Sequence, residues 1–466
     1  TALFIGDIIE GLLWAAGFDL VPGTGSWAAV PGYGTVWGVW MYTGDHKADV
    51  ISNSWGLSYW SEWLATNRMH WYSILTILED WLMVPGLIDP EYPGTVIVHA
   101  LGNGGPGYGT VTEPGYGFLP ISVGASTEMS FSQWYSGYGG GLRDEVASWS
   151  ARGPTPFGTA EPDVVAVGAY DAAATPVWHA VLRGLNGTCA WDLFGGTSMA
   201  TPVTAGTVAL VVQAYRMAYG EDPTPEMVKL IIKSTADDGG YDPFVQGVGR
   251  INAYKAVALA LGKAEGGLLI SSTASWENLK PFIAPAWSTG YYYSSQTPEI
   301  TPETWSDVDW FAGIVRPGES ASAVFTLRNL NDIYDMNVTL MAVGYEFVGS
   351  TCMTNVTESV FDAEQYSNYT WGYIWVLSPD QIPEDADLMV VYLNMSYDDF
   401  VCYGPIWTYV GLWNDTSGDG CMNMTEVTLV SLCENYGTTQ EVRVAMGLDY
   451  LKAGMGCLLY TSDAAD

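Results

Sequence analysis

The sequence has few positive charges. Only 16 of its 466 residues are Lys or Arg, against 51 Asp or Glu, which gives a formal net charge of −35. A surface of this sign repels the phosphate backbone of nucleic acids and disfavours nucleic-acid binding.

Long apolar runs are missing as well. No run of 18 apolar residues occurs, so we predict no membrane-spanning helix. No signal peptide is recognisable, because Thr1 leads directly into sequence of ordered character. The hydrophobic fraction of 48% is still large enough for a substantial core, and 466 residues is the length of two or three domains.

Cysteine is scarce, and four of the six cysteines fall at Cys352, Cys402, Cys421 and Cys433. Four cysteines allow three disulfide pairings, among which the sequence does not choose. Asn-x-Ser/Thr sequons gather in the same region, at Asn337, Asn355, Asn368, Asn394, Asn414 and Asn423. Both features favour an oxidising compartment, so we expect an extracellular or cell-surface glycoprotein.

The most informative stretch is residues 195–202, which read Gly-Gly-Thr-Ser-Met-Ala-Thr-Pro. Two glycines followed by a small, apolar segment up to residue 219 predict a tight turn that leads into a buried helix. Ser198 then lies at a helix N-terminus, where free N–H groups favour an oxyanion. We place Pro202 in the first turn, where a proline costs no hydrogen bond. The common alternative is a serine that only caps a core helix.

Two further segments read as strands that end in glycine-containing loops. Residues 49–56 form a strand that breaks at Gly56, and residues 95–100 form a β-branched strand typical of a parallel sheet. The loop after the second strand carries Asn103, whose amide can donate a hydrogen bond to a developing oxyanion. An asparagine in a glycine-rich turn is the ordinary alternative.

These segments, in this order, resemble the motifs of subtilisin-like serine proteases (subtilases, peptidase family S8), and the resemblance covers about residues 1–260. It implies an α/β fold with a doubly wound, mostly parallel sheet. It also implies a serine endopeptidase that acts on polypeptides without a cofactor, with Ser198 as nucleophile and Asn103 as oxyanion donor. The implied substrate-binding residues are Ser54, Trp55, Gly56, Leu101, Gly102 and Thr197, where Leu101 replaces the family's usual alanine.

The catalytic Asp and His motifs of that family are absent. Neither Asp-Thr-Gly nor His-Gly-Thr-His occurs, and none of the histidines (His46, His70, His99 and His179) has the motif's neighbours. A serine nucleophile needs such a base and its orienting carboxylate. We therefore interpret the chain as an inactive, N-terminally truncated fragment. The alternatives are a non-catalytic cell-surface binding protein and an exopeptidase of tripeptidyl type; the oligomeric state is not indicated.

The rest of the chain is divided by composition. Residues 261–310 read as a linker or docking segment, and residues 311–456, with short alternating strands, as an all-β sandwich. Residues 457–466 match a translated sequencing-library adapter, so we leave them out of the predicted fold. We also expect a helix from Asp7 to Ala16, capped by Asp7, and a long loop over residues 17–47.

One metal site is suggested by residues 415–426. Asp415, Ser417, Asp419 and Glu426 occupy positions 1, 3, 5 and 12 of a calcium-binding loop, with Gly420 at the turn position. A structural calcium ion would fit these ligands. An acidic hairpin turn is the alternative, since no clear helix flanks the loop.

Overall fold

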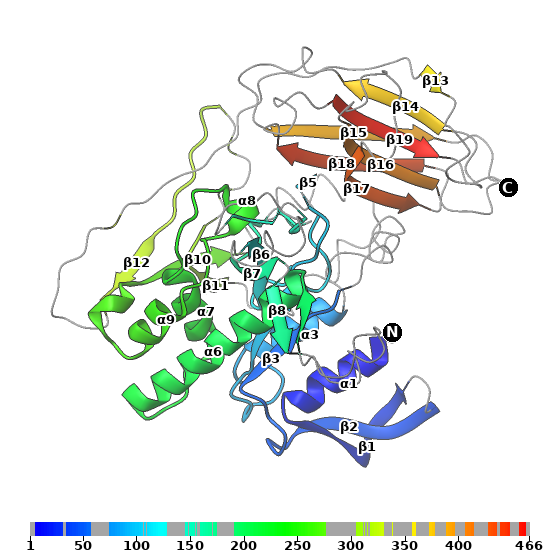
Figure 1. Cartoon of the computed structure of the whole chain (residues 1–466). Helices are drawn as coiled ribbons and strands as arrows, with labels where there is room; N and C mark the ends of the chain where they lie inside the picture. Colours follow the sequence, from blue (N-terminus) through cyan, green and yellow to red (C-terminus); the bar gives the residue numbers. More distant parts are fainter. Residues whose placement is uncertain are drawn as a thin grey trace. The chain divides into compact units, whose positions relative to one another are not determined.

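The computed structural model describes the chain in segments and divides it into two compact units (Figure 1). Unit 1 comprises residues 1–56, 72–103 and 111–340, and unit 2 comprises residues 57–71, 104–110 and 341–466. The described segments are 5–30, 34–56, 74–127, 145–174, 191–275 and 304–329, without 106, 109, 148, 154, 156–158, 170, 311, 313–314 and 316, together with residue 338 and the strands β13 to β19.

Unit 1 begins with a helix and a hairpin. Helix α1 spans Ile5–Ala15. Asp7 therefore lies inside its first turn, and our prediction that Asp7 caps the helix was wrong. The predicted loop is instead an antiparallel pair, β1 (Phe18–Val30) and β2 (Gly34–Tyr42). Phe18 is 1% exposed and contacts the rings of Tyr42 and Tyr92 at 5.4 and 5.1 Å. This aromatic packing stabilises the hairpin. The glycines in its strands obscure the alternation of apolar and polar residues by which a strand is recognised in a sequence.

A four-stranded parallel sheet forms the centre of unit 1. Its spatial order is β3-β4-β6-β7, and every neighbouring pair is parallel. The strands span Val50–Asn53 (β3), Val96–Ala100 (β4), Ile121–Thr127 (β6) and Val164–Ala169 (β7). The predicted parallel sheet is thereby confirmed, and its strands carry the β-branched residues of a sheet that is covered on its faces.

Helix α6 (Thr197–Tyr219) packs against all four of these strands (Figure 1). Its buried side chains, including Val208 and Val211, share one core with Val98, Val123 and other strand residues. The helix ends at Gly220, which adopts a left-handed conformation and donates its N–H to Arg216 O.

Unit 1 contains several further helices and short strands. They are α3 (Ile74–Met83), β8 (Asp171–Ala174), β9 (Trp191–Phe194), α7 (Pro225–Ser234), α8 (Pro243–Gln246), α9 (Ala253–Ala260) and η1 (Ala264–Gly266). Helix α7 is capped by Thr224, whose side chain accepts a hydrogen bond from Met227 N at 3.2 Å.

The segment predicted as a linker contains regular structure. Strand β10 (Leu269–Ser275) pairs with β11 (Thr304–Asp307) and β12 (Phe325–Arg328) in an antiparallel sheet. All three strands belong to the last segment of unit 1, residues 111–340. The polar composition of this region is compatible with strands because they pair with one another and attach to the core.

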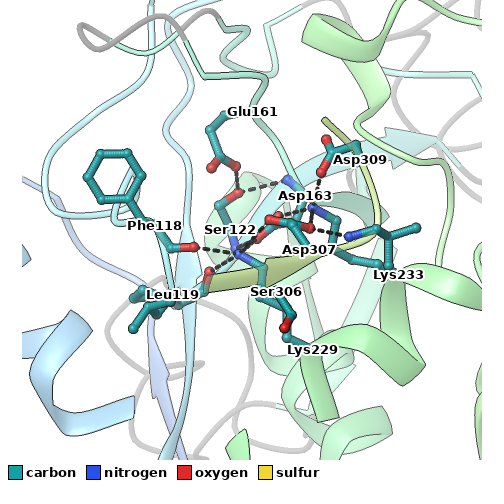
Figure 2. Close-up of polar contacts among 12 residues, drawn as sticks. Phe118, Leu119, Ser122, Glu161, Asp163, Lys229, Lys233, Ser306, Asp307 and Asp309 are labelled. Carbon is teal, nitrogen blue, oxygen red and sulfur yellow. Dashed lines mark hydrogen bonds and ion pairs between the residues drawn. The ribbon is translucent and has the colours of Figure 1, made fainter. Parts of the chain in front are cut away.

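A buried charge network attaches β11 to the core (Figure 2). Lys229 and Lys233 lie four residues apart on α7 and therefore on one face of the helix. Both ammonium groups reach Asp163 at the start of β7, at 2.9 and 2.7 Å. Lys233 also contacts the carboxylates of Asp307 and Asp309, the latter at 2.8 Å.

The network is satisfied by hydrogen bonds beyond its ion pairs. Lys229 donates to Phe118 O and Pro120 O at 3.0 and 3.1 Å, and Asp163 Oδ2 accepts from Ser122 N at 2.9 Å. Burial opposes the charge of Lys233, but the surrounding carboxylates outweigh it and raise its pKa well above the ordinary value. Burial and the charge of Asp163 raise the pKa of Glu161, which accepts from the Ser122 hydroxyl. The protonated form of Glu161 is thus favoured beside Asp163, against the opposing charges of Lys229 and Lys233.

Unit 2 consists of antiparallel sheets. The orders are β13-β14-β19-β16-β17 and β15-β18-β5. The strands span Gly107–Tyr108 (β5), Thr357–Ser359 (β13), Gly372–Leu377 (β14), Leu388–Ser396 (β15), Ile406–Trp413 (β16), Val427–Asn435 (β17), Thr439–Gly447 (β18) and Gly456–Ser462 (β19). Strand β19, in the stretch we left out of the predicted fold, pairs with both β14 and β16.

The network predicts a large cost for removing one cation. In Lys233→Met, Asp163, Asp307 and Asp309 share one buried cation fewer, with only Lys229 left near the first two, and we expect the free energy of unfolding to fall by about 3–5 kcal/mol. Lys255→Met is the matched control, because the Lys255–Asp237 pair has side chains 43% and 51% exposed. It should cost less than about 1 kcal/mol in denaturant unfolding. Equal effects of the two substitutions would contradict the stabilising role of the network.

Candidate functional site

Three chain segments meet at the carboxyl edge of the parallel sheet. Strands β3 and β4 are neighbours, so the residues that follow them, Ser54 and Leu101, emerge at the same edge. Helix α6 begins at this edge with Thr197 and Ser198. Parallel pairing and the packing of α6 on the sheet therefore bring together residues that are far apart in the sequence.

Thr197 links the start of α6 to Asn103. Its backbone N–H and its hydroxyl both donate to Asn103 Oδ1, at 2.9 and 3.1 Å. The same hydroxyl accepts the N–H of Gly102 at 3.1 Å. Because the amide oxygen of Asn103 is occupied, the amino group is the part of this exposed side chain left to donate to a ligand.

Ser198 is held against Ser54 by reciprocal hydrogen bonds. The Ser54 hydroxyl donates to Ser198 O at 2.9 Å, and the Ser198 hydroxyl donates to Ser54 O at 3.3 Å. Pro202 explains the first contact. It lies inside α6, not in the first turn as predicted, and has no N–H for the carbonyl four residues before it. The hydroxyl of Ser54 supplies the donor that Pro202 lacks.

Gly196 and Gly102 adopt backbone conformations in this site that favour glycine. Gly196 has φ +130°, and a Cβ there would lie 3.5 Å from Asn103 Nδ2. Gly102 has φ +112°, and its Cβ would come within 2.7 Å of the Thr112 side chain. Both conformations strain any other residue.

The other predicted substrate-binding residues differ in accessibility. Ser54 and Gly56 are exposed and Trp55 is half-buried. Leu101 is 0% exposed, and its backbone bonds with Val123 O and Thr112 N at 3.1 and 2.9 Å. The carbonyl of Gly102 accepts from Ala151 N at 3.0 Å. The backbone after β4 is therefore engaged within the protein, whereas the segment 54–56 has two exposed residues, Ser54 and Gly56.

Neither described histidine serves Ser198. His99 lies in β4, as predicted, but it is 0% exposed and faces Glu79 of α3, whereas its neighbour Val98 faces the α6 core. Burial lowers the pKa of His99 to about 4. His46 stacks on Trp14 at 4.8 Å. His70 and His179 lie outside the described residues.

Several buried polar residues beside the site were missed by sequence reasoning. Asn53, Glu79 and Glu113 are 6%, 0% and 3% exposed. The polar residue in strand β3 and the Glu-Asp pair within the apolar run of α3 were the available signals. A Cβ on Gly56 would lie 3.3 Å from Glu113 O, so Glu113 is next to the open segment 54–56.

The predicted calcium ligands cannot be placed in this site. Asp415, Ser417, Asp419 and Glu426 lie outside the described residues, as do all but two of the cysteines and most of the sequons. Among the residues that the structure does describe, no group of three or more His, Cys, Asp or Glu side chains is arranged to hold a metal ion. In the same part of the chain, no helix has the length and apolarity to cross a membrane.

Comparison with known proteins decides the family. The model of the subtilase family (peptidase S8) matches residues 23–250, which include the segments 54–56, 101–103 and 197–198. Residues 23–250 of the chain belong to the subtilase family. The resemblance seen in the sequence is thus confirmed, and the parallel sheet with its helices is the subtilase fold.

The matches cover only part of each relative. Pyrolysin from Pyrococcus furiosus is 25% identical over 447 residues, covering 81% of this chain but 29% of that protein. Serine protease AprX from Bacillus subtilis is 33% identical over 168 residues, covering 35% of each. The human membrane-bound transcription factor site-1 protease is 30% identical over 167 residues, covering 34% of this chain and 13% of that protein. The chain therefore spans about a third or less of these subtilases.

Glu113 makes the stability of this subtilase domain depend on pH. Burial raises its pKa from the ordinary 4.5 to about 7, so the folded protein retains a proton that the unfolded chain releases. Its contribution to stability is complete below pH 4.5 and is lost as the pH rises through about 7. The difference corresponds to about 3 kcal/mol.

We expect Glu113→Gln to remove this pH dependence. The free energy of unfolding of the wild type, relative to the variant, should fall between pH 4.5 and 8, as measured by urea unfolding. Glu91→Gln, at an exposed position, is the control and should follow the wild type. Parallel curves for wild type and Glu113→Gln would contradict this assignment.

Proposed function

We propose that this chain carries the nucleophile and oxyanion site of a secreted serine endopeptidase. Ser198 would attack the scissile carbonyl, and the Asn103 amino group and the Ser198 N–H would stabilise the resulting oxyanion. The observation that supports this best is Thr197, which occupies the Asn103 oxygen and leaves the amino group as donor beside the start of α6.

The open segment 54–56 is the proposed platform for the polypeptide substrate. This segment follows β3, with Ser54 and Gly56 exposed, and its backbone would pair with an extended peptide, as an added strand does. Leu101, Gly102 and Thr197, whose groups are engaged within the chain, shape the wall and fix Asn103. Substrates are thus selected through backbone pairing and through side-chain contacts with Trp55.

We further propose that the chain is inactive by itself. Among the described residues, no histidine is placed to take the proton of Ser198, and the motifs that supply the family's Asp and His do not occur in the sequence. Secretion is supported by the sequons and cysteines of residues 337–433, and the sheets of unit 2 are proposed to form an accessory sandwich. Calcium at Asp415, Ser417, Asp419 and Glu426 is kept as a proposal.

Peptide binding without cleavage is the first test. The purified chain should bind an extended blocked peptide, measured by calorimetry, and should not release the dye from a chromogenic version of it. Ser198→Ala should retain binding. Hydrolysis that Ser198→Ala abolishes would refute inactivity, and failure to bind any peptide would refute the proposed platform.

The roles of Ser198 and Asn103 are tested by supplying the missing base. When a subtilase segment with the Asp and His motifs is joined before residue 1 and gives activity, Ser198→Ala should abolish turnover. Asn103→Ala should lower kcat about 10²–10³-fold with little change in KM, because its hydrogen bond forms mainly in the transition state. Ser271→Ala, in β10, is the control. An Asn103→Ala variant that keeps full kcat would refute the oxyanion role.

A further inference from the structure

The Trp55 indole is held by contacts with Asn53 and His99, which we call the tether. Its indole Nε1–H donates to Asn53 Oδ1 at 3.3 Å. Its ring meets the His99 imidazole edge to face, with the ring centroids 4.9 Å apart and the planes at 80°. The residue is half-buried, so part of it remains accessible within the segment 54–56.

The tether continues to helix α3. Asn53 is 6% exposed, and its Nδ2 donates to Glu79 Oε1 at 2.9 Å. The same carboxyl oxygen lies 3.6 Å from His99 Nε2. Trp55, Asn53, Glu79 and His99 therefore form a closed circuit that joins β3, β4 and α3 behind the proposed substrate platform.

Burial disfavours the charged forms of both ionisable groups in the circuit. Burial raises the pKa of Glu79 well above its ordinary value, with smaller contributions from the charges of Asp80 and Glu113. Burial lowers the pKa of His99 to about 4. Glu79 Oε2 and His99 Nε2 have no hydrogen-bond partner among the described residues. Unsatisfied polar atoms in a buried site are costly, and a purely structural contact would be served as well by apolar side chains.

We propose that Asn53 and Glu79 are positioning residues that fix the Trp55 indole as a wall for an aromatic or large apolar substrate side chain. This inference rests on the proposed peptide platform at residues 54–56. A half-exposed tryptophan on a segment after a strand would otherwise sample several rotamers, and ordering it would cost binding energy. Because the hydrogen bond of its N–H orders the indole when the protein folds, substrate binding does not have to order it.

The tether itself is tested without any substrate. In the chain labelled with ¹⁵N-tryptophan, the Trp55 indole cross-peak is identified by its loss in Trp55→Phe. Asn53→Leu should shift or broaden this cross-peak and speed the exchange of its N–H with water. Ser52→Ala, at the exposed neighbouring position in β3, is the matched control and should leave it unchanged. The remaining indole signals report whether the fold is retained.

The consequence for recognition is tested by comparing peptides. The affinity ratio of a phenylalanine-containing peptide to its alanine counterpart should fall about tenfold in Asn53→Leu and in Glu79→Leu, the size of effect expected for losing one hydrogen-bonded contact. Glu79→Gln keeps an oxygen that accepts from Asn53 and should preserve the ratio, as should Ser52→Ala.

The two arms separate the inference from the proposed function. If the wild type binds no peptide, the proposed platform is refuted. The Trp55 indole cross-peak still tests whether Asn53 holds the indole, because that measurement needs no peptide. If Asn53→Leu and Glu79→Leu change neither the Trp55 signal nor the affinity ratio, and the wild type does bind peptides, the positioning role is overturned. An equal loss of affinity for both peptides would also overturn it, because it would indicate a general structural role.

Discussion

The site depends on one threonine that uses both of its donors on a single oxygen. Thr197 is 1% exposed and binds Asn103 Oδ1 through its backbone N–H and its hydroxyl. Without this double contact, an exposed asparagine on a loop would present its oxygen and its amino group with similar ease. The turn geometry of Gly196 and Gly102 brings the two segments close enough for the contact to form.

At the same edge, a hydrogen bond that is missing from helix α6 is replaced by one from another segment. Pro202 leaves the carbonyl of Ser198 without its helical donor, and Ser54, which directly follows β3, supplies a hydroxyl. Strand β3 is thereby attached to the residue proposed as nucleophile. The buried charges of α7, β7 and β11 lie elsewhere in the same unit and fix its outer sheet to the core. Unit 1 thus combines an apolar sheet–helix core with polar attachments at its edges.

Part of this arrangement could be predicted from the sequence. The strands at residues 50–53 and 96–100 and the helix after Gly196 follow from β-branched runs, glycine punctuation and a long apolar segment. Parallel strands share one carboxyl edge, so the proximity of Ser54, Asn103 and Ser198 was foreseeable once the sheet was parallel.

The remainder depended on contacts that are distant in sequence. The hairpin β1–β2 is anchored by Phe18 against Tyr92, which local composition cannot reveal. The pairing of Lys233 with Asp163 and Asp307 joins residues 70 or more positions apart, and the Glu79–Asn53 contact spans 26 positions. Pro202 was misplaced because the start of α6 was set by Gly196 and Thr197 and lies five residues before the proline. No local pattern carries this information.

The central claim, that Thr197 fixes the orientation of the Asn103 amide beside Ser198, is tested most directly by NMR on the chain labelled with ¹⁵N-asparagine. The account predicts two well-separated Asn103 side-chain proton signals, with nuclear Overhauser contacts to Thr197 and Gly196. Signals with the averaged shifts of a freely rotating side chain, and without those contacts, would contradict it.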